Sequence, residues 1–308
     1  MSGATPDTPS TPLSDGPVPP YVDPTRPSIA RVYDAFLGGT DNYEVDREVL
    51  RGVLKAAPEA ADLAVENRRF LVRACRYLAE QAGITQYLDC GSGLPTAENT
   101  HNVVQRTDPR ATVVYVDNDP MVVAHSRALL AGNENATIVP ADIFAPEELL
   151  RNETVRSRLD WTRPIALLHL GTLHHYNGEH IRTRKDIVRA YTEALPPGSY
   201  LAISHFLDPE DENSALARTM EDMFLHSMMG SGTFSTRAEL AALFDGLDLV
   251  APGLTRCLDW HPDTPPPPDT PPQDRPGQPG QPDRPGRPDS TRSNAARQCI
   301  AGGVARKP

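Results

Sequence analysis

Three aspartates, each at the end of a short apolar run, constrain the fold of this chain more than any other feature. Asp89, Asp117 and Asp142 each close a run rich in Val, Leu, Ile, Ala or Tyr. If these runs are neighbouring parallel strands, the carboxylates meet at the carboxyl edge of one sheet, where open α/β sheets bind ligands. A Gly-Ser-Gly turn at 91–93 follows the first aspartate and lets the backbone approach a ligand closely. The sequence therefore predicts an acid-lined ligand site at that edge.

Apolar runs alternate with helical patterns through most of the chain. Strands are expected at 86–90, 112–117, 137–142, 165–170, 200–204, 247–250 and 299–304, and helices at 29–37, 63–78, 97–106, 121–130, 180–195, 214–229 and 237–243. Strands separated by helices indicate a doubly wound, mostly parallel sheet with helices on both faces. The last strand is expected to return antiparallel beside the sixth, which completes a seven-stranded, Rossmann-like α/β fold.

Proline divides the chain into segments of different character. Of its 32 prolines, 8 lie in residues 1–27 and 12 lie in residues 262–288. Both segments contain too little apolar surface to offset the entropy of ordering, so residues 1–27 and 262–295 are expected to be disordered. One domain over residues 28–261, completed by a last strand within 296–308, is the expected organisation.

Charge and cysteine usage exclude several classes of protein. The formal net charge of −11, without a basic cluster, argues against nucleic-acid binding. No apolar run approaches the roughly 18 residues of a membrane span, and the polar N-terminus lacks the apolar core of a signal peptide. The four cysteines form no Cys-x-x-Cys pair, which indicates reduced thiols, no metal site and a cytoplasmic protein.

The glycine turn and its surroundings restrict the cofactor. A dinucleotide fingerprint requires a third glycine where Thr96 stands. Asp117 lies 24 positions after Gly93 in the sequence. An acid at this position of a dinucleotide-binding fold binds the ribose hydroxyls, and it disfavours a 2′-phosphate. No Lys or Arg between residues 87 and 105 would neutralise a pyrophosphate, whereas acids attract a sulfonium cation. This balance of charge favours S-adenosylmethionine over NAD.

The motifs around the turn resemble an actinobacterial family of S-adenosylmethionine-dependent methyltransferases, formerly labelled only as a domain of unknown function, DUF574. The matching segments occur in order and with similar spacing, at 28–42, 88–101, 114–120, 195–200 and 305–308. The resemblance covers roughly 28–262 and the last few residues. Two features depart from the family pattern, namely the long proline-rich insertion and the glycine pattern at 301–305. The resemblance implies a class I methyltransferase fold and cofactor, and it implies no particular acceptor.

The resemblance also implies which residues hold the cofactor. Asp117 would accept hydrogen bonds from both ribose hydroxyls, Asn118 would flank the adenine, and Asp142 would accept from its amino group. For Asp142 the alternative is a structural role as a helix N-cap. Asp89 and the glycines would line the methionine moiety. The full set of expected cofactor-binding residues is Tyr33, Asn42, Asp89, Gly91, Ser92, Gly93, Asp117, Asn118, Asp142, Ile143 and Gly171.

The segment before the first strand has two interpretations. Its apolar residues recur at helical spacing after Ser28, so it is either a helix packed on the sheet edge or a lid. In the lid interpretation, a hinge at Gly38 and Gly39 closes Tyr33 and Asn42 over the cofactor and excludes water.

Two adjacent histidines, His174 and His175, follow the fourth strand, where acceptors approach in class I methyltransferases. Either residue is a candidate general base, and the alternative is that the pair only orients the turn. His205, after the fifth strand, is a weaker candidate of the same kind. Methionines at 220–229 recur at helical spacing, which is typical of a core helix or of an apolar acceptor pocket.

These features support one main hypothesis and two alternatives. The main hypothesis is a methyltransferase that uses S-adenosylmethionine to methylate oxygen or nitrogen of a small molecule. The first alternative is an NAD-dependent oxidoreductase on the same architecture. The second is a non-catalytic protein of cofactor-binding fold, in which the proline-rich loop docks a partner.

Overall fold

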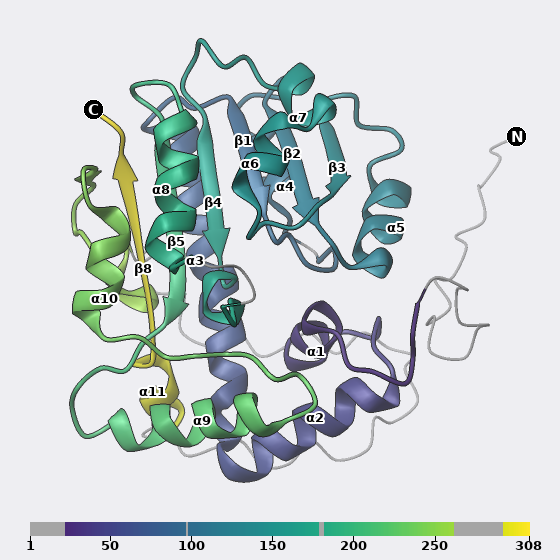
Figure 1. Cartoon of the computed structure of the whole chain (residues 1–308), viewed down its shortest axis with the longest axis vertical. Coiled ribbons are helices and arrows are strands. Elements are labelled where there is room, and N and C mark those ends of the chain that lie inside the picture. Colours follow the sequence, from purple (N-terminus) through teal and green to yellow (C-terminus); the bar gives the residue numbers. More distant parts are fainter. Residues whose placement is uncertain (1–21, 97, 179–181, 262–291) are drawn as a thin grey trace, which may run out of the picture.

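The structure, a computed structural model, describes residues 22–96, 98–178, 182–261 and 292–308 (Figure 1). Its centre is an eight-stranded sheet in the order β3-β2-β1-β4-β5-β8-β6, with β7 paired to β8. β1 to β5 are parallel, and β8 is antiparallel to its three neighbours. The strands are β1 (Gln86–Cys90), β2 (Thr112–Asp117), β3 (Ala136–Pro140), β4 (Ala166–Leu170), β5 (Tyr200–Phe206), β6 (Asp248–Leu249), β7 (Thr255–Arg256) and β8 (Ile300–Arg306).

Helices cover both faces of the sheet (Figure 1). The α-helices are α1 (Ile29–Phe36), α2 (Glu44–Ala56), α3 (Ala61–Glu80), α4 (Thr100–Val104), α5 (Pro120–Leu129), α6 (Pro146–Arg151), α7 (Glu153–Arg158), α8 (Arg184–Ala194), α9 (Ser214–His226), α10 (Arg237–Ala241) and α11 (Arg292–Arg297). In the described residues, no helix is both long and apolar enough to cross a membrane.

The alternation of side chains along the strands produces two core layers. Tyr87 of β1 belongs to the core layer that contains buried side chains of α3, α4 and α5, whereas its neighbour Leu88 belongs to the layer that contains those of α6, α7, α8 and α10. Both are fully buried, as expected for a parallel sheet covered on two sides. Because each strand contributes to both layers, the carboxyl edge is the part of the sheet left to hold a ligand.

Three helices, α1, α2 and α9, lie below the carboxyl ends of the parallel strands (Figure 1). Their amphipathic sequences bury Val32 of α1, Val53 of α2 and Phe224 of α9. These side chains belong to the same core layer as the long helix α3. The three helices therefore form a floor beneath the edge where the sequence places the aspartates.

The expected fold is confirmed in its main elements. The first five strands, their parallel pairing and the antiparallel last strand agree with prediction, but the sheet has eight strands because Thr255–Arg256 adds a short β7. β8 lies between β5 and β6, so the last strand does pair with the sixth. Helices α2, α6, α7 and α11 were not predicted.

The expected disordered segments lie mostly outside the described residues. The boundaries of both segments differ from the expected ones. Residues 22–27 are described, and Val22 among them is buried. α11 begins at Arg292, inside the segment 262–295 that was expected to be disordered. The proline-rich partner-docking loop of the second alternative hypothesis lies outside the described residues.

The two glycines of β8 explain the unusual sequence at 301–305. A Cβ on Gly302 would lie 2.6 Å from Cζ of Phe70, a fully buried side chain of α3. A Cβ on Gly303, on the opposite face, would lie 3.2 Å from Cζ of Phe244. The glycines therefore let aromatic rings pack directly against the strand.

Replacing Gly302 with alanine is expected to destabilise the protein by about 1–3 kcal/mol, because the added methyl overlaps the Phe70 ring in a packed core. Chemical denaturation measures the change. The double variant that also carries Phe70→Leu should recover part of the loss. Equal stability of Gly302→Ala and the parent would contradict the close packing of α3 on β8.

Candidate active site

A cavity of about 400 Å³ lies at the carboxyl edge of the sheet. All of the predicted site residues line it except Asn42 and His174. The side chains that reach it come from the ends of β1, β2, β3 and β4, from α1 and α3, and from the segment after α9. Its predicted lining residues are Tyr33, Asp89, Gly91, Ser92, Gly93, Asp117, Asn118, Asp142, Ile143, Gly171 and His175.

The turn after β1 is shaped by glycine. Gly91 has φ of +77°, and a Cβ there would lie 2.5 Å from Cγ2 of Thr172. Gly93 has φ of +65°, and its amide donates to Oδ2 of Asp117 over 2.9 Å. The turn therefore exposes backbone to the cavity, and it is tied to the end of β2.

Two of the carboxylates are buried, and burial raises the pKa of each to about 6. Asp117 accepts hydrogen bonds from the amides of Gly93 and Asp119, which oppose the rise in pKa. Asp89 accepts from Oγ1 of Thr100 over 2.6 Å, with the same opposing effect on its pKa. Asp142 lies two residues beyond β3 and accepts from the amide of Phe144 over 2.8 Å. Asp142 thus both shapes its turn and lines the cavity.

These raised pKa values predict a pH dependence of ligand binding. Each carboxyl has an ordinary pKa of 3.8 and a folded value of about 6, so its stabilising effect on the fold is complete below 3.8 and is lost as the pH rises through 6. A ligand that needs the charged form should therefore bind more weakly as the pH falls below 6. Calorimetry in two buffers of different ionisation enthalpy should show proton release on binding near pH 6, and a pH-independent affinity between 5 and 7.5 would contradict it.

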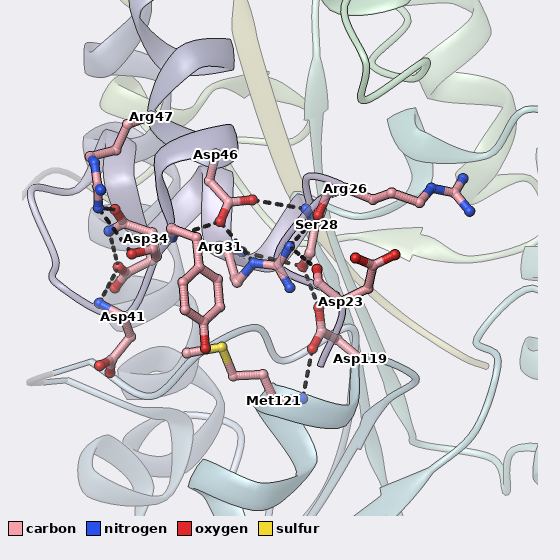
Figure 2. Close-up of polar contacts among 12 residues, drawn as sticks. Asp23, Arg26, Ser28, Arg31, Asp34, Asp41, Asp46, Arg47, Asp119 and Met121 are labelled. Carbon is pink, nitrogen blue, oxygen red and sulfur yellow. Dashed lines mark hydrogen bonds and ion pairs between the residues drawn. The ribbon is translucent and has the colours of Figure 1, made fainter. Parts of the chain in front are cut away.

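Residues 22–28, here called the strap, are held against the site by a buried ion pair (Figure 2). Nε of Arg31 lies 2.8 Å from Oδ2 of Asp46, and both side chains are buried. Asp46 also accepts from the amide of Ser28 over 3.0 Å, and Arg31 donates to the carbonyl of Arg26. The hydroxyl of Ser28 donates to Asp119, at the start of α5. The strap therefore connects α1 and α2 to the start of α5, just beyond the end of β2.

Asn42, expected to close over the cofactor, lies outside the cavity. Its Nδ2 donates to Oδ2 of Asp34 over 2.8 Å, and its Oδ1 accepts from Arg47. Close packing against Asp34, and not a hinge, explains the glycine at position 39. A Cβ there would lie 2.0 Å from Oδ1 of Asp34. The turn at 38–42 is thus folded around the Asp34 carboxylate.

Asn67 of α3 is a cavity residue that was not predicted as part of the site. Its Nδ2 donates to the hydroxyl of Tyr33 over 3.0 Å, and its Oδ1 accepts from Ser204. The Tyr33 hydroxyl in turn donates to the carbonyl of Ala64. A Cβ on Gly171 would lie 2.6 Å from Nδ2 of Asn67, so the glycine makes room for this amide. The sequence did contain a sign of this role, because Asn67 is a polar residue within the apolar stripe of a helix.

The two histidines differ in position. His175 lines the cavity, its Nδ1 lies 3.0 Å from Oγ of Ser231, and burial lowers its pKa to about 4. His174 stacks on Phe206 with ring centroids 3.6 Å apart, and burial lowers its pKa. Nδ1 of His205 lies 2.7 Å from the carbonyl of Phe206, away from the cavity lining. The described residues contain no metal-binding cluster of His, Cys, Asp or Glu.

A smaller pocket of about 40 Å³ lies next to the large cavity. The two share six lining residues, which are Ile29, Tyr33, Asn67, Gly171, His175 and Met229. Most of its remaining lining is apolar and includes Phe36, Phe206 and Phe224. Of the methionines at 220–229, Met228 and Met229 line the large cavity, whereas Met220 is fully buried in the core.

The sheet order, with its antiparallel strand between the fifth and sixth strands, and the glycine turn followed by an acid at the end of β2 define a class I methyltransferase fold. Residues 16–308 match the model of the S-adenosyl methyltransferase family, and the chain belongs to that family. No curated protein matches the chain.

Two solved structures support this assignment. A protein of Thermobifida fusca named a "putative methyltransferase" shares 38% identity, with 94% of this chain and 98% of that chain covered and a TM-score of 0.79. A DUF574 family protein of Streptomyces avermitilis shares 32% identity, with 92% and 98% covered and a TM-score of 0.75. The resemblance noted in the sequence is thereby confirmed, and the cofactor is S-adenosylmethionine rather than NAD.

The residues present fit this cofactor. Gly91, Ser92 and Gly93 line the cavity, and the cavity is large enough for a nucleoside with an amino-acid substituent. The buried carboxylates of Asp89 and Asp117 provide acceptors for hydroxyl and ammonium groups.

The four cysteines are buried and free of disulfides.

Proposed function

We propose that this methyltransferase transfers a methyl group to oxygen or nitrogen of a small, largely apolar acceptor. The observation that carries the proposal is that two adjacent cavities share six lining residues, one cavity lined by carboxylates and glycines and the other by aromatic rings. The acid-lined cavity suits the cofactor, and the aromatic pocket suits an apolar part of the acceptor. His175 and Met229 lie at the boundary between the two.

Within the large cavity, the proposed positions follow the strand ends. Asp117 accepts hydrogen bonds from the ribose hydroxyls, with Asn118 and Asp142 near the adenine. Asp89 and the turn at 91–93 lie beside the methionine half, with Tyr33 and Gly171 on the opposite side. The lining of one cavity by all of these residues supports the assignment.

The cofactor supplies a methyl group that its sulfonium makes electrophilic, so the protein contributes mainly position and exclusion of water. The strap and the segment after α9 both line the cavity, through residues such as Pro27 and Met228. His175 is neutral at physiological pH because burial lowers its pKa to about 4, and we propose that it accepts the acceptor's proton or orients the acceptor's nucleophile.

Replacing His175 with alanine is expected to lower the rate of methyl transfer by about tenfold to a hundredfold. The affinity for S-adenosylmethionine should change by less than about threefold, because the ring lies at the acceptor side. Transfer of labelled methyl into small molecules of a host extract measures the rate, and calorimetry measures the affinity. A variant with the parent's rate would contradict a role for His175 in the transfer.

The proposal as a whole is tested by binding and by transfer. S-adenosylmethionine and S-adenosylhomocysteine should both bind at tens of micromolar or below, and label should enter a low-molecular-weight product. Absence of heat with both compounds would overturn the cofactor site, whereas label that enters only protein or nucleic acid would overturn the small-molecule acceptor. The net charge of −11 and the absence of disulfides support a cytoplasmic enzyme that does not bind nucleic acid.

A further inference from the structure

The imidazole of His175 has a single hydrogen-bond partner among the described residues. Its Nδ1 lies 3.0 Å from Oγ of Ser231, a buried side chain in the segment that follows α9. In the part of the chain that the structure describes, neither side chain has a second hydrogen bond. Because His175 lines both cavities, Nε2 is the ring nitrogen left to meet an acceptor.

Backbone contacts hold Ser231 against the turn that carries His175. Two residues beyond Ser231, the amide of Thr233 donates to the carbonyl of His174 over 2.9 Å. Arg184 of α8 in turn donates to the hydroxyl of Thr233. The contact between Ser231 and His175 is therefore built into the packing of this segment on the turn after β4.

The two groups favour one direction of the hydrogen bond. A hydroxyl can both donate and accept, whereas each nitrogen of a neutral imidazole does one or the other, according to the tautomer. If Nδ1 carried the proton, the buried hydroxyl of Ser231 would have no acceptor among the described residues, and an unpaired buried donor is costly. If the hydroxyl donates to Nδ1 instead, it is paired, and the proton of the ring lies on Nε2.

His205 provides a comparison within the same site region. Its Nδ1 lies 2.7 Å from the carbonyl of Phe206, which can only accept, so His205 carries its proton on Nδ1. A histidine that acts as a base commonly has such a partner, which leaves the lone pair of Nε2 free. Among the described residues, no carbonyl or carboxylate binds Nδ1 of His175. Burial also lowers the pKa of His175 to about 4, so the ring is neutral and weakly basic at physiological pH.

We propose that Ser231 holds His175 in the tautomer with its proton on Nε2, so that His175 donates a hydrogen bond to the methyl acceptor and is not a general base. The inference rests on the proposed function and selects one of the two roles given there for His175. It also restricts the acceptor. The atom that faces the ring must present an electron pair, as an oxyanion, a carbonyl oxygen or an unprotonated nitrogen does. Ser231 is a positioning residue, because it acts through the ring.

NMR of the full-length protein with 15N-labelled histidine tests the tautomer without cofactor or acceptor. Near neutral pH, correlations between ring nitrogens and ring protons should place the proton of His175 on Nε2 and that of His205 on Nδ1. The signals of His175 are identified by their loss in His175→Gln. Ser231→Ala should move the Nδ1 resonance towards that of an unbonded nitrogen, and Ser231→Thr, which keeps the hydroxyl, should not. A proton on Nδ1 of His175, or an unchanged resonance in Ser231→Ala, would overturn the proposal.

Methyl transfer provides a second readout. The amide of glutamine can donate a hydrogen bond but cannot take up a proton at neutral pH. His175→Gln should therefore keep the transfer of labelled methyl into small molecules of a host extract within about threefold of the parent, in contrast to His175→Ala. Ser231→Ala should lower this rate by about threefold to tenfold, and Ser231→Thr should restore it. Equal losses in His175→Gln and His175→Ala would overturn the donor role.

Ser227→Ala is the matched control. It removes a hydroxyl from the same segment, one that donates to the carbonyl of Phe224 over 2.8 Å and not to the ring. The Nδ1 resonance of His175 should stay unchanged, and a shift equal to that in Ser231→Ala would overturn the proposal, because the Ser231 hydroxyl would then have no special part. Absence of methyl transfer by the parent would instead overturn the proposed function, and the donor role with it, whatever tautomer NMR shows.

Discussion

Replacing Asp46 with alanine is expected to lower the free energy of unfolding by about 3–5 kcal/mol, because it leaves the Arg31 guanidinium buried without its carboxylate. The carboxylate also accepts from the amides of Ser28 and Tyr43, which would lose their acceptor. Urea denaturation measures the loss. Because the strap lines the cavity, S-adenosylmethionine should also bind more weakly to the folded fraction.

Two further variants separate this effect from the loss of an ordinary ion pair. Asp46→Asn keeps one acceptor oxygen and should cost less than alanine. Glu147→Ala breaks an exposed pair with Arg182, whose N···O distance is 2.6 Å, and should cost no more than about 1 kcal/mol. If Asp46→Ala were as mild as Glu147→Ala, the buried pair would not be what holds the strap.

Replacing Asp117 with alanine should weaken the binding of S-adenosylmethionine by roughly tenfold to several hundredfold, because hydrogen bonds to a charged group contribute about 1.5–3 kcal/mol each. The structure adds an effect on stability that a rim position would not have. Asp117 is buried and accepts two backbone hydrogen bonds, so alanine should also destabilise the unliganded protein by about 1–2 kcal/mol.

Asp117→Asn is the matched variant, since its side-chain oxygen can still accept from one of the two amides. It should fold more stably than the alanine variant, yet it lacks the charge and the second acceptor oxygen for the ribose. Calorimetry of the two variants beside the parent decides the matter. If either variant bound the cofactor as tightly as the parent, the ribose would not lie at the end of β2.

The parts of the site that follow strand ends could be predicted from the sequence, because a parallel sheet brings the ends of β1, β2 and β4 to one edge. Asp89, Asp117 and Gly171 illustrate this, because the position of each residue relative to its own strand was sufficient to predict that it lies at the site. The ion pair of Arg31 and Asp46 could not be predicted, because it joins two helices whose packing has no one-dimensional signal.

Two residues show how local pattern misleads. Asn42 has the polar, glycine-flanked context of a lid residue, but its amide satisfies the buried carboxylate of Asp34. Asn67 sits in an apolar helical stripe and reads as part of the core, yet it lines the cavity and binds Tyr33. In both cases the hydrogen-bond partner decides the role, and that partner is distant in sequence or on another element.

The position of β8 has a consequence for how the protein can be made. β8 fills the place between β5 and β6, although almost one hundred residues separate it from β5 in the sequence. Until Ile300–Arg306 has been synthesised, the hydrogen-bonding edge of β5 is unpaired, and such an edge is prone to association with other chains. Completion of the cofactor-binding sheet is therefore a late event in translation. A nascent chain stalled before β8 is expected to need protection by chaperones, even though every strand that bears a proposed ligand-binding residue has already been made.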